Sequence, residues 1–166
     1  RSGVAKRVHL VARAASDVRD VMVEGESGIL SVSPPDFRPE YEPSKRRLTW
    51  PNGAVATTFS SEQPEALRGP QCDFAWCDEL ASWRYTEAWD MLLFGLRLGI
   101  HPRVIVTTTP RPRRFLRDLA ELESTITTTG STMENKSNLS PVFIQTIFDR
   151  YGDTHLGRQE LEGELL

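Results

Sequence analysis

The sequence of 166 residues has little of what marks secreted and membrane proteins. Two cysteines, Cys72 and Cys77, are too few for a disulfide framework, so a reducing compartment is expected. The longest apolar run, residues 91–94, is far shorter than the roughly 20 residues that span a bilayer. Residues 1–7 hold no apolar stretch of the kind found in signal peptides. We therefore expect a protein of the cytosol with no membrane partner.

An excess of positive charge is also missing. The chain has 20 Lys and Arg against 23 Asp and Glu, a net charge of −3, so contact with nucleic acid must come from local clusters. Hydrophobic residues make up 39% and charged residues 26%, which are ordinary globular values and exclude a disordered or fibrous chain.

A phosphate-binding loop is absent from these residues. The motif Gly-x-x-x-x-Gly-Lys-Ser/Thr places backbone N–H groups and a lysine on nucleotide phosphates. No glycine in this sequence precedes a lysine, and the glycine-rich stretch 25–28 lacks one altogether. We expect the isolated chain to bind a nucleotide poorly.

The hydrophobic pattern predicts an α/β fold. Apolar runs indicate strands at 8–12, 74–77, 104–106 and 125–129, and helical periodicity indicates helices at 86–98, 113–123 and 141–151. Such alternation is typical of a mostly parallel sheet flanked by helices. The β-branched run 104–106 is expected to be buried on both faces. Ser16 is expected to cap a helix with Val18, Val21 and Met22 on one face.

Two further segments have local signals. Asn-Gly at 52–53, between strand-like stretches 47–50 and 54–59, predicts a β-hairpin. Residues 33–43 contain four prolines and are expected to form a loop. The four tryptophans are expected in the core rather than on a stacking surface, and Cys77 likewise is expected to be a core residue.

Polar residues follow two successive strands. Asp78 and Glu79 end the first, where an Asp can hold Mg²⁺ against nucleotide phosphates and a Glu can deprotonate water. Thr107, Thr108 and Thr109 end the next, where hydroxyls can contact a phosphate. In a parallel sheet these ends lie side by side, which favours a nucleoside-triphosphatase core. The alternative is an acidic helix start after one strand and ordinary strand threonines in the other.

Several arginines are candidates for phosphate contacts. Arg68, in a loop flanked by Pro and Gly, could act as an arginine finger, although its spacing alone favours a solvated loop residue. Residues 45–47 and a second cluster fit contacts with DNA or, equally, a solvated helix face; the second cluster is Arg111, Arg113, Arg114 and Arg117.

An ordered set of short stretches resembles one family, the large terminase subunits of tailed phages, prophages and gene-transfer agents. Trp-Cys-Asp-Glu at 76–79 resembles its Walker B motif, and Thr-Thr-Thr-Pro-Arg-Pro at 107–112 its coupling motif. Residues 8–25, 50–54, 64–70, 135–139 and 151–160 resemble the flanking elements in the same order.

The resemblance implies part of an ATP-driven motor that packages double-stranded DNA into a procapsid, in the cytoplasm of a bacterial host. Asp78 would assist Mg²⁺, Glu79 would be the catalytic carboxylate, and Thr107, Thr108 and Thr109 would couple hydrolysis to movement. Arg68 matches the finger that acts across subunits. The implied partners are the portal protein, the small terminase subunit and further copies in a ring.

The implied fold is a P-loop NTPase-like (ASCE) sheet, incomplete at its N-terminal end and carrying a β-hairpin insertion. Residues 1–166 would be a partial ATPase domain without P-loop or nuclease domain, inactive alone and holding neither ATP nor Mg²⁺. Strand 104–106 would then lie at a sheet edge or a gap, and the chain should either self-associate or repair that edge with another segment. Two alternatives stay open: a DExx-box helicase or other P-loop NTPase, and a decayed prophage remnant or non-catalytic DNA- or protein-binding module.

Overall fold

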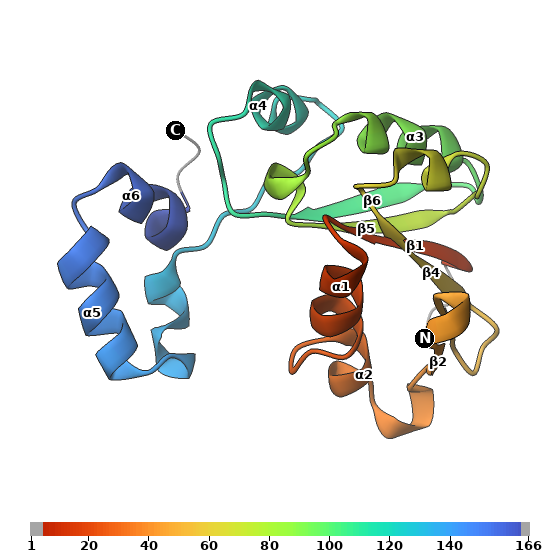
Figure 1. Ribbon diagram of the computed structural model, residues 1–166, viewed down its shortest axis with the longest axis horizontal. Coiled ribbons are helices and arrows are strands. Elements are labelled where there is room, and N and C mark those ends of the chain that lie inside the picture. The colour runs from red at the N-terminus through yellow and green to blue at the C-terminus, as the bar shows by residue number, and fades with distance from the viewer. Residues whose placement is uncertain (1–4, 164–166) are drawn as a thin grey trace. The chain divides into compact units, whose positions relative to one another are not determined.

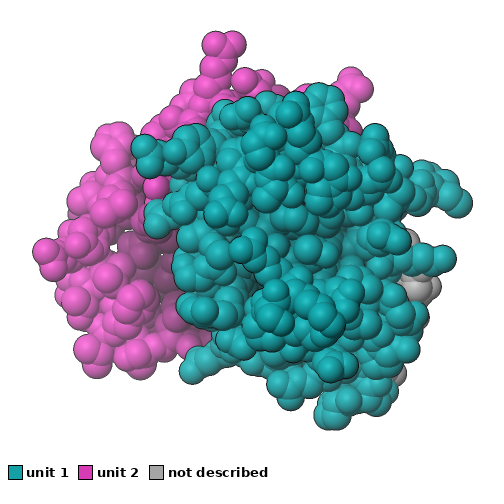
Figure 2. All heavy atoms as spheres, turned by 45° about the vertical axis from the view of Figure 1, so that its right-hand side comes forward, with its two compact units in different colours: residues 1–108 teal, residues 109–166 magenta. Residues whose placement is uncertain are grey.

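The chain forms two compact units, residues 1–108 and residues 109–166 (Figure 2). The computed structural model describes residues 5–163. The first unit contains a β-sheet with helices on both faces, and the second is helical. Within the described residues, no helix is long and apolar enough to cross a membrane.

A six-stranded, mostly parallel sheet organises the first unit, in the order β2-β3-β4-β1-β5-β6. Strands β4, β1, β5 and β6 run parallel, and β3 and β2 add antiparallel at one edge. The carboxyl ends of the parallel strands therefore share one edge, as the sequence predicts. The strands are β1 (Arg7–Ala12), β2 (Glu40–Glu42), β3 (Arg47–Thr49), β4 (Val55–Ser60), β5 (Phe74–Asp78) and β6 (Arg103–Thr107).

The expected hairpin is present as β3 and β4. Gly53 adopts φ +82°, which the turn requires, and its N–H donates to the carbonyl of Trp50 at 2.9 Å. The second arm, β4, lies inside the main sheet between β3 and β1. The proline-rich segment 33–43 is not wholly a loop, because β2 pairs there with β3. An edge strand tolerates prolines on its flanks, where the ladder of hydrogen bonds is not interrupted.

Helices cover the two faces of the sheet. Figure 1 shows α3 (Glu87–Gly95) over one face and α1 (Ala15–Asp17) with α2 (Ile29–Val32) against the other. Alternation along each strand divides the side chains between the faces. On β5, for example, Ala75 and Cys77 are fully buried while Trp76 packs beside the core under α1 and α2. The prediction that Cys77 is a core residue is confirmed.

The helix after β1 differs from the expected one. Ala14, not Ser16, occupies the cap position, and Val18–Val23 form a π-helical segment, η1. Its closing hydrogen bond, from Glu24 N to Arg19 O, spans five residues. The wider turn buries Val18, Met22 and Val23 and leaves Val21 58% exposed. The predicted face with Val21 inward is therefore wrong.

Helix α3 ends at Gly95 and is therefore shorter than the helix 86–98 that the sequence predicts. A Cβ at this residue would lie 2.5 Å from the carbonyl oxygen of Pro70, so the helix approaches that loop closely only through a glycine. Beyond it, Leu96 forms a bridge with Cys72. Leu93, within the helix, and Ile100, beyond it, are exposed.

Strand β6 forms one edge of the sheet in the described part of the chain, with β5 as its neighbour. Val104 and Val106 are half-buried, and Ile105, on the other face, is 51% exposed. The prediction of burial on both faces is wrong, and the edge position that the family resemblance implies is confirmed.

The second unit contains α4 (Arg114–Ala120), a 3-10 segment η6 (Thr132–Asn138), α5 (Pro141–Tyr151) and α6 (His155–Glu162). Ser131 and Glu134 form a capping box at η6, and the Thr154 hydroxyl accepts the N–H of Gly157 at the start of α6. The expected strand 125–129 is not formed, and Ile126 is 93% exposed. Strand propensity needs a neighbouring strand to pack against, and these residues have none among those described.

Candidate functional site

Asp78 and Thr107 face each other at the carboxyl ends of β5 and β6. They are partners in the register of the two parallel strands. The Thr107 hydroxyl donates a hydrogen bond to Oδ1 of Asp78 at 2.5 Å. The expectation that these two strand ends meet is confirmed.

Two tryptophans complete this arrangement. The indole N–H of Trp76 donates to Thr107 Oγ1 at 2.9 Å, and that of Trp83 donates to the backbone carbonyl of Asp78 at 3.0 Å. Sequence reasoning placed both residues in the core and missed their polar contacts. The signal for Trp76 was available, because residues 76 and 78 of one strand point to the same face.

Glu79 is one of two described non-glycine residues with a left-handed backbone, at φ +49° and ψ +46°. It lies between the end of β5 and the 3-10 turn η5 (Leu80–Ser82), which it caps. The backbone N–H and the hydroxyl of Ser82 both donate to its carbonyl at 2.7 Å. For a residue with a Cβ this conformation costs about 1 kcal/mol, and such strain gathers at functional sites. No sequence signal identified it.

The other two threonines lie at the end of β6. The Thr108 hydroxyl accepts the backbone N–H of Ala81 at 3.0 Å, which ties this strand end to the turn after Glu79. Thr109 is half-buried and is the first residue of the second unit. Thr107 therefore contacts Asp78, and Thr108 contacts the turn that follows Glu79.

Arg68 does not join this group. It follows the 3-10 segment η4 (Pro64–Leu67), its side chain is largely exposed, and it pairs with Glu65 at 3.3 Å. With Phe94 and Arg97 it lines a hollow of about 270 Å³ at the C-terminal end of α3. The chain enters α3 from the Asp78 side, and a helix of nine residues is about 13 Å long. Arg68 thus lies beside the far end of α3.

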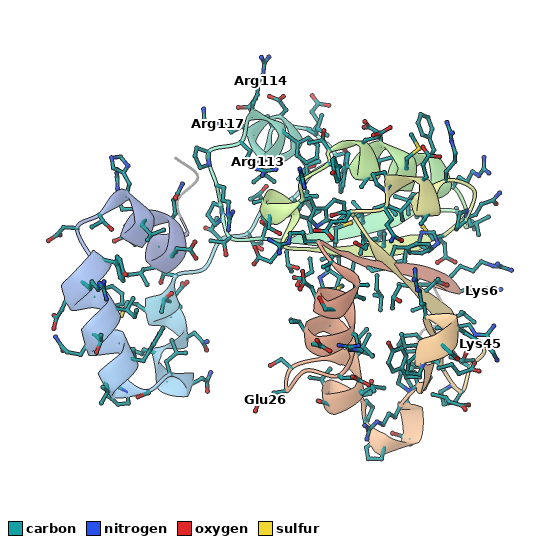
Figure 3. The ribbon with its side chains drawn as sticks, viewed as in Figure 1. Lys6, Glu26, Lys45, Arg113, Arg114 and Arg117 are labelled. Atoms are coloured by element: carbon teal, nitrogen blue, oxygen red, sulfur yellow. The ribbon has the colours of Figure 1, made fainter. Side chains whose placement is uncertain are left out.

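The arginines of the second unit surround α4. Figure 3 shows the Arg114 side chain extending away from the helix, and it is 94% exposed with a 3.7 Å contact to Asp118. Arg111 and Arg117 are exposed, and Arg113 is half-buried.

The other basic cluster, residues 45–47, is partly neutralised by an acid. Lys45 and Arg47 both bind Glu42, at 2.5 and 2.9 Å. Their hydrogen bonds hold the pKa of the Glu42 carboxyl below its usual value. This cluster therefore presents less positive charge to a phosphate backbone than its sequence indicates.

The donor set around Asp78 fits Mg²⁺ shared with a nucleotide. Within residues 5–163 no three His, Cys, Asp or Glu side chains gather into a metal cage. Mg²⁺ is usually held by one or two carboxylates together with substrate phosphates and water. Asp78 supplies one such carboxylate, and its Oδ1 accepts the Thr107 hydroxyl.

Comparisons with known proteins agree on one family. Residues 5–166 match the family described as terminase large subunit, T4likevirus-type, N-terminal. The fold is similar to the large terminase ATPase domain of Thermus phage P74-26, with a TM-score of 0.66 and 13% sequence identity, covering 97% of this chain and 77% of that one. A point mutant of that domain matches over the same shares, with a TM-score of 0.65 and 14% identity. No curated protein matches.

Proposed function

The chain belongs to the family of T4-like-virus-type terminase large subunits, as part of their N-terminal region, and from this we propose that it contributes to an ATP-hydrolysing motor that moves double-stranded DNA into a procapsid. The hydrogen bond between Thr107 and Asp78, directly beside Glu79, carries the proposal. It joins an acidic strand end to a threonine-rich one at the edge of the sheet where α/β proteins bind ligands.

The two carboxylates have different roles in this proposal. Asp78 holds Mg²⁺, directly or through water, with ATP as the substrate. When bound, Mg²⁺ supplies positive charge that stabilises the transferred phosphoryl group. Glu79 orients the attacking water and accepts its proton. Asp78 is the last residue of strand β5, whereas the left-handed backbone of Glu79 turns the chain away from the strand. The side chains of these two adjacent residues therefore leave the backbone in different directions.

Thr107, Thr108 and Thr109 couple hydrolysis to movement in the same scheme. A change at Asp78 alters the hydrogen bond of Thr107, and Thr108 connects the same strand end to the turn after Glu79. Thr109 continues directly into the second unit. The chain thus has a short covalent path from the site of hydrolysis to the unit with the exposed arginines, for which double-stranded DNA is the proposed partner.

Arg68 serves a neighbouring subunit in this proposal. Its position beside the far end of α3 separates it from Asp78 of its own chain. Two different patches on one chain that meet in successive copies give a head-to-tail contact, and such contacts form a ring when the rotation between copies closes. The portal protein and the small terminase subunit are the further partners we propose, in the cytoplasm of the host.

A mixing experiment tests the assignment in a large-subunit protein that carries these residues. Glu79→Gln is expected to lower the ATP turnover rate by roughly 100-fold or more. Arg68→Ala is expected to do the same, and a mixture of the two variants to recover part of the rate, because mixed rings contain intact pairs. Arg38→Ala, at another exposed arginine, serves as the control. Full activity of Glu79→Gln would refute the role of Glu79, and no recovery in the mixture would refute action across subunits.

The isolated 166 residues provide a second test. Because no Gly-Lys-Ser/Thr loop occurs among them, we expect them to hydrolyse ATP no faster than their own Glu79→Gln variant. A rate that Glu79→Gln abolishes would show that this chain is an ATPase by itself.

A further inference from the structure

The hydrogen bonds around Asp78 form a chain with one direction. An indole N–H is a donor only, so Trp76 must donate to Thr107 Oγ1. A threonine hydroxyl has a single proton, and with one of its lone pairs already engaged by the indole it directs that proton to Oδ1 of Asp78. Removal of the indole would leave the hydroxyl free to rotate.

The sheet explains why Trp76 reaches Thr107. Residues 76 and 78 of β5 share one face, and their partners across the strand pair are Ile105 and Thr107. The Trp76 indole therefore reaches diagonally past its own partner, Ile105, to Thr107, the next residue of β6 on the same face. Such diagonal contacts between strands are within reach of long aromatic side chains. Ile105, on the same face, is 51% exposed.

We propose that Trp76 is a positioning residue for a divalent cation bound at Asp78. Through the Thr107 hydroxyl it keeps Oδ1 engaged and holds the carboxylate in one rotamer, with Oδ2 toward the cation. This inference rests on the proposed function, because it assumes that Asp78 is the cation ligand. Partners in the shell outside a metal ligand typically change metal affinity by about 10- to 100-fold when they are removed.

Trp83 provides an internal reference for the same site. It is 1% exposed, and its indole donates to the backbone carbonyl of Asp78 rather than to the carboxylate chain. A cation at Asp78 is therefore close to both indoles, but only Trp76 acts through Thr107. Trp50, on the hairpin at the other side of the sheet, is the matched control.

The first arm of the test uses no metal. The four indole N–H signals of the ¹⁵N-labelled protein are assigned by Trp→Phe variants. Thr107→Val and Asp78→Asn are both expected to move the Trp76 signal, and Thr107→Ser to leave it near its original position. An unchanged Trp76 signal in Thr107→Val would show that the indole does not donate to Thr107, and would overturn the inference.

The second arm titrates the protein with Mn²⁺ alone and follows paramagnetic broadening of the indole signals. We expect Trp76 and Trp83 to broaden before Trp50, and Asp78→Asn to abolish this order. In Trp76→Phe, broadening of Trp83 is expected to require about 10-fold more Mn²⁺, while Trp50→Phe changes nothing. Far-UV circular dichroism confirms that each variant is folded, and Thr107→Ser is expected to bind Mn²⁺ as the wild type does.

The outcomes separate this inference from the proposed function. Broadening at Trp83 that is unchanged in Trp76→Phe would overturn the role of Trp76 and leave Asp78 as the cation ligand. Broadening of neither Trp76 nor Trp83 in the wild type would overturn the inference, since Asp78 would then bind no cation without a nucleotide, and would leave the proposed function standing, since that function places the cation between Asp78 and nucleotide phosphates.

Discussion

The imidazole of His9 lies against the ring of Phe59 on the neighbouring strand, with ring centroids 4.6 Å apart and an angle of 57° between the planes. His9 is 4% exposed, and in the described part of the chain its Nδ1 has no hydrogen-bond partner. Burial lowers the pKa of His9 to about 4 from its usual value of 6.5. The histidine in the middle of the sheet is therefore neutral at physiological pH.

This pKa predicts a specific loss of stability in acid. Between pH 6.5 and 4 the unfolded chain binds a proton at His9 that the folded chain does not, so the free energy of unfolding falls as the pH falls through this window. The full loss is about 3 kcal/mol. Urea unfolding from pH 7 to pH 4 measures it, and the fall should be smaller by this amount in His9→Phe. His101→Gln, at an exposed histidine, is expected to follow the wild type, and equal slopes in all three proteins would contradict the prediction.

The contact between Gly95 and Pro70 predicts a large effect of one methyl group. Gly95→Ala places a Cβ 2.5 Å from a backbone oxygen, so α3 or the loop must shift. We expect the free energy of unfolding to drop by about 2 kcal/mol. Gly130→Ala is the matched control, because its Cβ would meet only the flexible carboxylate of Glu134 at 3.4 Å. Equal midpoints for the two variants in urea would refute the close approach.

The left-handed backbone of Glu79 predicts a conflict between stability and activity. Glu79→Gly is expected to have a free energy of unfolding about 1 kcal/mol higher than that of Glu79→Ala, because glycine adopts this conformation without steric cost. Both variants are expected to abolish ATP hydrolysis in a large subunit that carries them. Arg46→Gly, at the second left-handed position (φ +53°), should give a similar gain in stability with activity intact. A Glu79→Gly protein less stable than Glu79→Ala would argue against strain at this residue.

The two basic clusters predict different effects on binding to duplex DNA. Replacing Arg114 or Arg117 by Ala is expected to weaken binding and to reduce the slope of log K against log salt by about 1 for each phosphate that the protein no longer neutralises. Arg47→Ala is expected to change the slope less, because Glu42 binds that guanidinium at 2.9 Å, whereas the contact of the exposed Arg114 with Asp118 is 3.7 Å long. Fluorescence anisotropy at several salt concentrations measures these slopes. Equal effects at Arg47 and Arg114 would show that DNA does not distinguish the two clusters.

The parts of the fold that follow from local chemistry were predictable from the sequence. Asn-Gly determines the hairpin turn, and a run of apolar residues that stops at Asp78 marks both a strand and its end. Because parallel strands end at a common edge, the meeting of Asp78 with Thr107 was also predictable.

The remaining features depend on contacts that sequence periodicity does not contain. The π-helical turn moves burial from Val21 to Val23, although the apolar pattern alone fits an α-helix. The strand-like residues 125–129 have no neighbouring strand among the residues that the structure describes. The bonds of Trp76 and Trp83 follow from strand register and a tight turn, and both are set by the fold as a whole.

The two outer strands of the sheet differ as templates for further chains. Strand β2 presents Glu40 and Glu42, and like charges of this kind discourage a second copy from adding there. Strand β6 has the sequence Arg-Val-Ile-Val-Thr, with a single charge and a half-exposed Ile105. Of the two outer strands in the described part of the chain, we therefore expect β6 rather than β2 to accept a further strand, so a short peptide that pairs with β6 would occupy this edge.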